Sequence, residues 1–232
     1  MTHQEKLIIA LDVADIDAAK KLVDEIGNAA VFYKIGLELM MSGSYFELVK
    51  WLKGKGKKVF ADLKLYDISQ TVGRAVRNLA QYEIDLLTIH TASREIMEKA
   101  AENRGKMQVI GVTVLTNLDQ KDLNEMGFDS DISLENLVEK KTELALKSGL
   151  NGIVASALEA QDLRTKFGKD FLIISPGIRL EALKNDDQKR VADVKTAIQN
   201  GASHLVVGRP ITGEANPKEM VQKFNQLIGK FS

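Results

Sequence analysis

The sequence predicts a single-domain α/β protein with the fold of a (β/α)8 barrel (TIM barrel), and three observations support that prediction. Short apolar runs rich in β-branched residues alternate with longer charged stretches of helical period, as expected for repeated strand–helix units with a parallel sheet. About eight such units fit into 232 residues, which is close to the size of a (β/α)8 barrel. Finally, the segment LDVADIDAAK after the first strand lacks the glycine-rich phosphate loop that is typical of a doubly wound open sheet.

The expected strands follow one another along the whole chain. By residue number they are 6–13, 31–36, 58–64, 85–90, 107–115, 152–157, 171–177 and 204–209. Amphipathic stretches between them are expected to be helices, for example residues 15–26, 44–55 and 133–149. The chain has only three prolines and no low-complexity segment that would serve as a linker, so residues 1–232 are expected to form one barrel domain.

Composition restricts the classes of function. The 32 basic and 32 acidic side chains cancel, which argues against a nucleic-acid surface and against a charged, disordered tail. The absence of cysteine excludes disulfides, thiolate metal sites and thiol nucleophiles. The apolar run before Asp12 is too short for a signal sequence or a membrane span, so we expect a cytoplasmic protein with neither a membrane nor a nucleic acid as its partner.

Two connections between predicted elements are longer than the others. Residues 116–133 and 179–190 both follow predicted strands. In a barrel, such connections lie at the C-terminal face, where active sites are found and where loops close over substrates. An ordinary surface loop would explain their length equally well.

The strand at 58–64 ends in charged residues. Side chains alternate between the two faces of a strand, so Phe60, Asp62 and Lys64 share one face while the residues between them form an apolar face. The apolar face suits the layer that packs against helices. The charged residues are therefore expected to face the barrel interior, near its C-terminal mouth.

Neighbouring strands add charges at the same mouth. Asp12 lies near the end of the first strand, on the same face as Ile8 and Ala10, Lys34 lies in the second, and His90 ends the fourth. Salt bridges that plug the barrel would be a purely structural explanation, and they suffice for any single pair. Two lysines and two aspartates at the ends of three successive strands favour an active site instead.

Glycine and arginine follow the last two predicted strands, in SPGIR (175–179) and VVGRPIT (206–212). Many barrels bind a phosphate at this place, with backbone N–H groups and guanidinium donors. Gly208 would allow close approach of the backbone, and Arg209 would supply charge. A glycine in a turn needs no function by itself, but its position here, beside a charged mouth, indicates a phosphate site.

Six motifs, in this order and spacing, resemble the orotidine 5'-monophosphate decarboxylase family: ALDV, FYKIG, DLKLYDI, PGIR, DDQKR and VVGRPIT. The resemblance extends from Asp12 to Thr212, and D-x-K-x-x-D-I is its most specific element. It implies a homodimeric (β/α)8 barrel that acts as a carboxy-lyase of pyrimidine biosynthesis. Such an enzyme makes uridine 5'-monophosphate and carbon dioxide from the nucleotide orotidine 5'-monophosphate, without a metal or an organic cofactor.

The resemblance also implies roles for the charged residues of the mouth. Lys64 would protonate C6 of the pyrimidine as carbon dioxide leaves, and Asp62 would lie beside the substrate carboxylate. Lys34 and Asp12 would hold the ribose and complete the charge network. The residues expected to act in catalysis are thus Lys34, Asp62, Lys64 and Asp67.

The remaining implied contacts lie farther from the reacting carbon. Thr116 would contact the pyrimidine. Three residues would reach the site from the neighbouring subunit: Asp67, Ile68 and Thr71. The phosphate would be bound by Arg179, Gln188, Gly208 and Arg209.

Two positions depart from the family pattern, and other functions stay open. Ser69 and Gln70 replace a usual Pro-Asn pair, and Ser93 and Arg94 replace a common glycine pair; neither change removes a catalytic group, but both leave the substrate affinity open. Metal-dependent sugar-phosphate lyases and decarboxylases of the same superfamily share the D-x-K-x-x-D core. A barrel that only binds phosphorylated ligands, or a scaffold protein, would be non-catalytic alternatives.

Overall fold

The computed structural model describes residues 2–180 and 190–232 and contains a closed barrel of parallel strands, which confirms the predicted (β/α)8 fold. The strand order around the barrel is β1-β10-β7-β6-β5-β4-β3-β2. The bounds of these strands are β1 Leu7–Ala10, β2 Phe32–Ile35, β3 Lys58–Leu65, β4 Leu86–His90, β5 Gln108–Val112, β6 Gly152–Val154, β7 Leu172–Ser175 and β10 His204–Val207.

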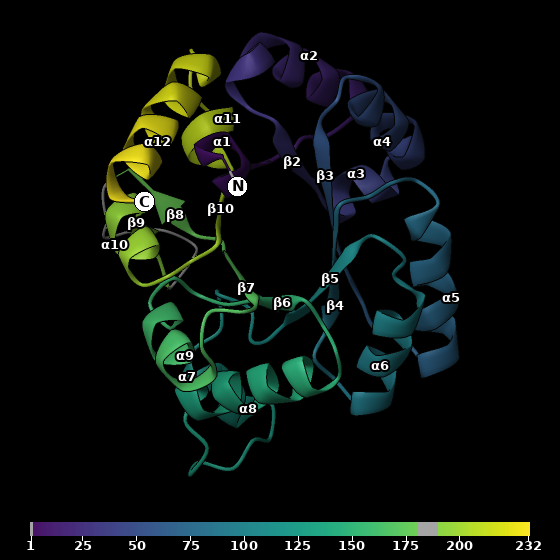
Figure 1. Ribbon diagram of the computed structural model, residues 1–232, viewed down its shortest axis with the longest axis vertical. Coiled ribbons are helices and arrows are strands. Elements are labelled where there is room, and N and C mark those ends of the chain that lie inside the picture. The colour runs from purple at the N-terminus through teal and green to yellow at the C-terminus, as the bar shows by residue number, and fades with distance from the viewer. Residues whose placement is uncertain (1, 181–189) are drawn as a thin grey trace.

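Helices form an outer ring around the strands (Figure 1). The helices in the first half of the chain are α1 His3–Lys6, α2 Ile16–Ile26, the 3-10 helix η1 Gly27–Ala29, α3 Leu37–Met41, α4 Tyr45–Gly54, α5 Ser69–Ala80 and α6 Arg94–Asn103. Those in the second half are α7 Gln120–Glu125, α8 Leu134–Lys147, α9 Ala160–Phe167, α10 Val194–Gln199, α11 Arg209–Thr212 and α12 Pro217–Phe231. No helix in the described ranges is long and apolar enough to cross a membrane.

All eight predicted strands are present, but most end earlier than their apolar runs suggest. The first predicted strand extends to residue 13, whereas β1 ends at Ala10. The fifth extends to residue 115, whereas β5 ends at Val112. The residues that follow β5 in this predicted strand still belong to the barrel mouth, where Val114 and Leu115 line a cavity. Both residues line the cavity, and Val114 also packs in the outer core, so neither needs to continue the strand.

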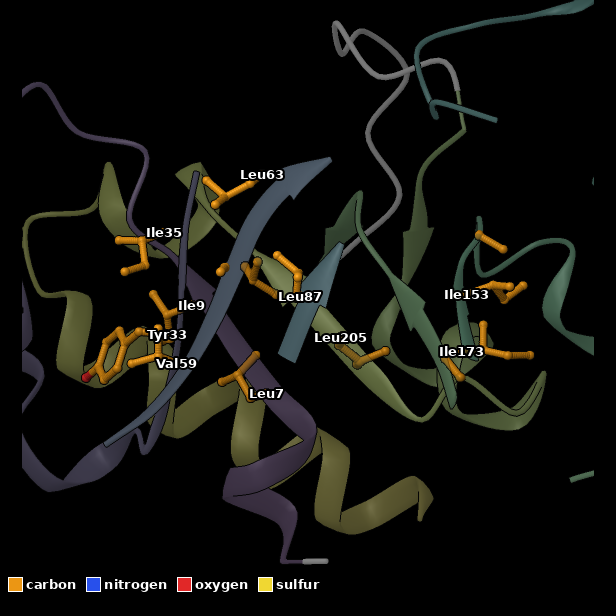
Figure 2. Close-up of a cluster of buried hydrophobic side chains, with 14 of the residues drawn as sticks. Leu7, Ile9, Tyr33, Ile35, Val59, Leu63, Leu87, Ile153, Ile173 and Leu205 are labelled. Atoms are coloured by element: carbon orange, nitrogen blue, oxygen red, sulfur yellow. The ribbon is translucent and has the colours of Figure 1, made fainter. Parts of the chain in front are cut away.

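The alternation of side chains along the strands builds two cores. The inner core, inside the barrel, contains large apolar residues from seven strands: Ile8, Phe32, Phe60, Leu86, Ile110, Ile174 and Val206. The outer core lies between the strands and the helices, and Figure 2 shows part of it, including Ile9, Tyr33, Val59 and Leu205. Phe60 belongs to the inner core and Ala61 and Leu63 to the outer one, as the pattern of the strand predicts.

A second, two-stranded sheet adjoins the barrel mouth and was not predicted. β8 (Ile178–Arg179) pairs in parallel with β9 (Ala192–Asp193), with Arg179 opposite Asp193. Strands of two residues are too short to leave an alternation pattern in the sequence. Their consequence is local, because they hold the backbone of Arg179 close to the end of β7.

Candidate active site

A cavity of about 390 Å³ opens at the C-terminal ends of the barrel strands. Its apolar wall includes Ala10, Phe60, Val154 and Val206, which are the last layer of inward-facing side chains. Most of the residues predicted for the site meet in this one cavity: Asp12, Lys34, Asp62, Lys64, Thr116, Arg179, Gly208 and Arg209.

Lysines and aspartates form a continuous network on one side of the cavity. Lys34 Nζ donates to Asp12 Oδ1 at 2.8 Å and lies 3.5 Å from Asp62 Oδ2. Lys64 Nζ lies 2.8 Å from the other oxygen, Asp62 Oδ1. Asp62 therefore stands between two ammonium groups, and its side chain is only 14% exposed. The carboxylate fixes both lysines relative to the cavity.

Asp62 keeps its charge although it is buried. Burial by itself would raise the pKa of the carboxyl. Lys34 and Lys64, together with a hydrogen bond from Thr88, outweigh burial and hold the pKa of Asp62 below its ordinary value. The cavity thus has a fixed negative charge directly beside two positive ones.

The backbone at Lys64 departs from regular strand geometry. Its φ of +47° lies in the left-handed region, and the register between β3 and β4 shifts between Ala61 and Leu65. A non-glycine residue adopts this conformation only where its surroundings hold it there. Thr88 in β4 contributes, because its Oγ1 accepts from the N–H of Lys64 and donates to Asp62 Oδ1, both at 2.9 Å. The strict alternation expected for residues 58–64 therefore does not by itself place Lys64.

Sequence reasoning missed Thr88, although a signal was present. Thr88 is fully buried and stands two residues before His90, so it shares the inward face of β4 with Leu86. A hydroxyl on the inward face of a strand that neighbours β3 needs a hydrogen-bond partner. Asp62 is the partner that the next strand offers.

Arginines line the cavity where the chain leaves β7 and β10. Arg179 lies in β8 and is 8% exposed. Arg209 begins α11 directly after β10, with Gly208 before it. A Cβ atom added to Gly208 would lie 3.5 Å from Ala10 Cβ and 3.7 Å from Asp12 Oδ2, which are ordinary contacts. The packing of the chain does not itself demand glycine here, so the small residue leaves room at the cavity wall.

Four predicted site residues are not in this lining as the structure describes it. Asp67, Ile68 and Thr71 lie beyond the end of β3, and Asp67 and Ile68 are exposed. The carboxylate of Asp67 accepts from the N–H of Ile68 at 2.6 Å. Gln188 lies outside the described residues.

His90 lies beside the network. Its ring meets that of Tyr66 edge to face, with 5.9 Å between the centroids. Burial and the nearby ammonium groups of Lys141 and Lys64 lower the pKa of His90, which favours the neutral ring. Within the described residues, His, Cys, Asp and Glu form no group of three or more that would suit a metal ion.

Together, the fold and the cavity define a class: a (β/α)8 barrel with a lysine–aspartate network and two arginines at one mouth. Residues 5–224 match the family model described as "Orotidine 5'-phosphate decarboxylase / HUMPS family". The chain belongs to this family.

Individual relatives agree with the family match. The chain is 48% identical over 225 residues to a protein of Methylococcus capsulatus, with 97% of this chain and 92% of the relative covered. It is 46% identical to a protein of Nitrobacter winogradskyi, with 94% and 90% covered. Both relatives are called orotidine 5'-phosphate decarboxylase. The crystal structure of orotidine 5'-phosphate decarboxylase from Lactobacillus acidophilus superposes with a TM-score of 0.85 at 29% identity, over 96% of this chain and 98% of the other.

Proposed function

We propose that this protein decarboxylates orotidine 5'-monophosphate to uridine 5'-monophosphate and carbon dioxide, as a single-domain enzyme of pyrimidine biosynthesis that needs no cofactor. The observation that carries the proposal is the Lys34–Asp62–Lys64 network, which shares one cavity with Arg179 and Arg209. Family membership supports the choice of substrate. The barrel itself does not, because one fold supports many chemistries.

The reaction requires a preorganised cation at C6 of the pyrimidine. When the C6–carboxylate bond breaks, its electron pair stays on C6 in the plane of the ring, where the π system does not delocalise it. An ammonium group held beside C6 stabilises that carbanion and then gives it a proton. Lys64 fits this role because its Nζ lies 2.8 Å from Asp62 Oδ1, which fixes the position of the ammonium group in the cavity. After the transfer, the neutral amine regains a proton from water.

The other groups orient the substrate. Asp62 would lie beside the carboxylate that leaves, while Lys34 and Asp12 hold the ribose. Thr116 lies on the cavity wall where the pyrimidine would rest. The phosphate would be bound by Arg179, Gly208 and Arg209, with Gln188 as a further predicted contact. Binding energy from this remote group helps to orient the reacting carbon.

We also propose a homodimer in which Asp67, Ile68 and Thr71 complete the site of the neighbouring subunit. Large apolar side chains gather after β2 and β3, which are neighbouring strands: Leu37, Met41, Tyr66 and Ile68 are between 51% and 77% exposed. Such a group of exposed apolar side chains is typical of a protein–protein contact. Asp67 lies within it, which suits a residue that acts across a two-fold interface. The cytoplasmic location stays a prediction.

A single assay tests the reaction and the absence of a metal. Purified protein is dialysed against a chelator and mixed with orotidine 5'-monophosphate, and the ultraviolet absorbance of the pyrimidine is followed. We expect turnover that is unchanged by the chelator. Absence of turnover in both untreated and treated protein would refute the proposed activity. Activity that disappears on chelation and returns with magnesium would instead indicate a metal-dependent reaction, as in the sugar-phosphate enzymes of the superfamily.

A further inference from the structure

Arg190 connects three segments at the barrel mouth. It precedes β9, and its guanidinium extends to the segments that follow β5 and β6. Nη1 forms an ion pair with Glu159, and Nη2 donates to the carbonyl oxygens of Val114 (3.2 Å) and Leu115 (2.9 Å). The second carboxylate oxygen of Glu159 accepts from the N–H of Ser156 at 3.0 Å. One side chain therefore links parts of the chain that are 31 and 75 residues away from it.

These segments contribute different parts of the cavity wall. Two residues after Arg190, β9 begins and pairs with β8, which carries Arg179 at the arginine-bearing end. Val114 and Leu115 lead directly to Thr116, at the end proposed for the pyrimidine. A short chain of contacts thus connects these two parts of the wall, and the guanidinium of Arg190 is its central link.

Stability alone explains this arrangement poorly. The side chains of Arg190 and Glu159 are only 14% and 11% exposed, so both ions have lost most of their water. Burial lowers the pKa of Arg190, and its Nε has no hydrogen-bond partner among the described residues. A buried ion pair with an unsatisfied donor is a weak source of folding free energy, but its fixed geometry can define how segments are arranged.

We propose that Arg190 is a positioning residue that fixes the distance between the phosphate end and the pyrimidine end of the cavity, and that Glu159 orients it. The inference rests on the proposed function, because the two ends acquire meaning only from a substrate that spans them. Arg190 itself does not line the cavity in the described structure, so it acts through the backbone of Val114, Leu115 and β9.

The chain offers a matched control at the far end of the barrel. Arg164 in α9 is also partly buried and also donates to backbone carbonyls, those of Gly201 (3.0 Å), Phe171 (2.9 Å) and Gly168 (3.4 Å). It further donates to Ser203 Oγ at 2.9 Å. These partners precede β7 and β10, so they lie at the N-terminal ends of strands whose C-terminal ends form the cavity. Arg164 therefore also joins backbone segments through its guanidinium, and none of these partners lines the cavity.

The test compares Arg190→Met with Arg164→Met. For Arg190→Met we expect kcat/KM for orotidine 5'-monophosphate to fall about a hundredfold, because misplacing the reacting groups by about 1 Å costs roughly that much. Arg164→Met should change kcat/KM by less than about threefold, even if its melting temperature falls as far as that of Arg190→Met. Arg190→Lys, which keeps the charge but has no planar fork of donors, should recover only part of the loss.

Inhibition constants give a readout that loss of stability alone would not produce. Arg190→Met should weaken competitive inhibition by uridine 5'-monophosphate about tenfold, because that ligand spans both ends of the cavity. Inhibition by inorganic phosphate, which needs only one end, should stay within about twofold. If Arg190→Met does not fold, Glu159→Gln provides the same comparison. The amide places an NH2 donor where one of the two carboxylate oxygens accepted, from Arg190 or from Ser156.

The outcomes separate the two proposals. If the wild-type protein does not decarboxylate the nucleotide, the proposed function fails and the role of Arg190 fails with it. If the wild type is active but Arg190→Met keeps its kcat/KM within about threefold, only the positioning role is refuted. Equal weakening of inhibition by phosphate and by the nucleotide would also refute it.

Discussion

The two mouths of the barrel contain similar side chains in different arrangements, and the strand β3 shows the contrast directly. Lys58 begins this strand at the N-terminal mouth and pairs with Glu5 at 2.5 Å. Lys64, six positions later on the same strand, pairs with Asp62 in a network that also contains Lys34. The N-terminal lysine has regular strand geometry, whereas the C-terminal one has a positive φ. The same residue type thus serves two purposes on one strand.

The size of a hollow does not distinguish the two mouths. The N-terminal mouth has a cavity of about 820 Å³, which is larger than the cavity of about 390 Å³ at the C-terminal mouth. Two of its lysines each pair with a different carboxylate: Lys53 with Asp85, and Lys58 with Glu5. Asp85 also accepts from the N–H of Val59, so it supports the strand. At the C-terminal mouth, by contrast, two lysines converge on Asp62. The comparison teaches that convergence of charge, and not volume, marks the candidate site.

The largest effect is expected when the two lysines of β3, one at each mouth, are replaced separately. Lys64→Ala should reduce turnover of orotidine 5'-monophosphate below about a thousandth of wild type, because it removes both the stabilising cation and the proton donor. Lys58→Ala should leave turnover unchanged and cost less than about 1 kcal/mol of unfolding free energy, since its ion pair is partly exposed. Steady-state kinetics and thermal melting measure both. Substantial turnover in Lys64→Ala would remove this residue from the mechanism.

The second prediction concerns the arginine-bearing end of the same mouth. Arg209→Ala should lower kcat/KM about a thousandfold, because a charge-assisted contact to a phosphate is worth several kcal/mol when the transition state uses it. The mutant should also lose most of its preference for the nucleotide over orotidine, which has no phosphate. Kinetics with both substrates measure this preference. A mutant that keeps the full preference would contradict a role of Arg209 in phosphate binding.

A third prediction sharpens the comparison by asking whether the C-terminal mouth is complete within one chain. Lys64→Ala and Asp67→Asn should each be inactive alone. If Asp67 serves the neighbouring subunit, a mixed dimer has one site with both lesions and one site with neither. Equal, random mixing makes about half of the dimers mixed, so roughly a quarter of the wild-type sites should return.

The measurement is to unfold the two mutants together, refold them and assay them, with each mutant refolded separately as the control. Mass spectrometry or size-exclusion chromatography of tagged chains would confirm that mixed dimers have formed. If mixed dimers are present without any gain in activity, Asp67 belongs to its own subunit and the shared site is wrong.

The sequence predicted the fold and most of the residues that line the candidate site for a simple physical reason. Strand periodicity places inward-facing residues of parallel strands at one mouth, so Asp12, Lys34 and Asp62 had to meet there. The left-handed backbone of Lys64 could not be predicted, because it depends on the shift in register between β3 and β4. Contacts such as Arg190 with Leu115 join segments 75 residues apart and leave no local pattern.

The smallest expected effect concerns the histidines of the two mouths, His90 and His204. His204 begins β10 at the N-terminal mouth, is 4% exposed, and packs edge-on against Phe32. Its Nδ1 has no hydrogen-bond partner in the described part of the chain, although a satisfied histidine would be the common case. Burial lowers its pKa to about 4, with Lys58 and Lys6 lowering it further and Glu5 opposing them.

This shift makes stability depend on pH in a defined window. Below its ordinary pKa of about 6.5, His204 binds a proton in the unfolded chain but not in the folded one, so acid favours unfolding. The loss should grow as the pH falls toward about 4, to at most about 3 kcal/mol, and then level off. His204→Phe, which keeps an aromatic ring but does not titrate, should lack this part of the pH dependence. Because His90 is present in both proteins, its contribution cancels in the difference. Urea denaturation of both proteins between pH 7 and about 4.5 measures this difference in the free energy of unfolding. Parallel declines of wild type and His204→Phe would show that His204 is not the buried neutral group that distinguishes the N-terminal mouth.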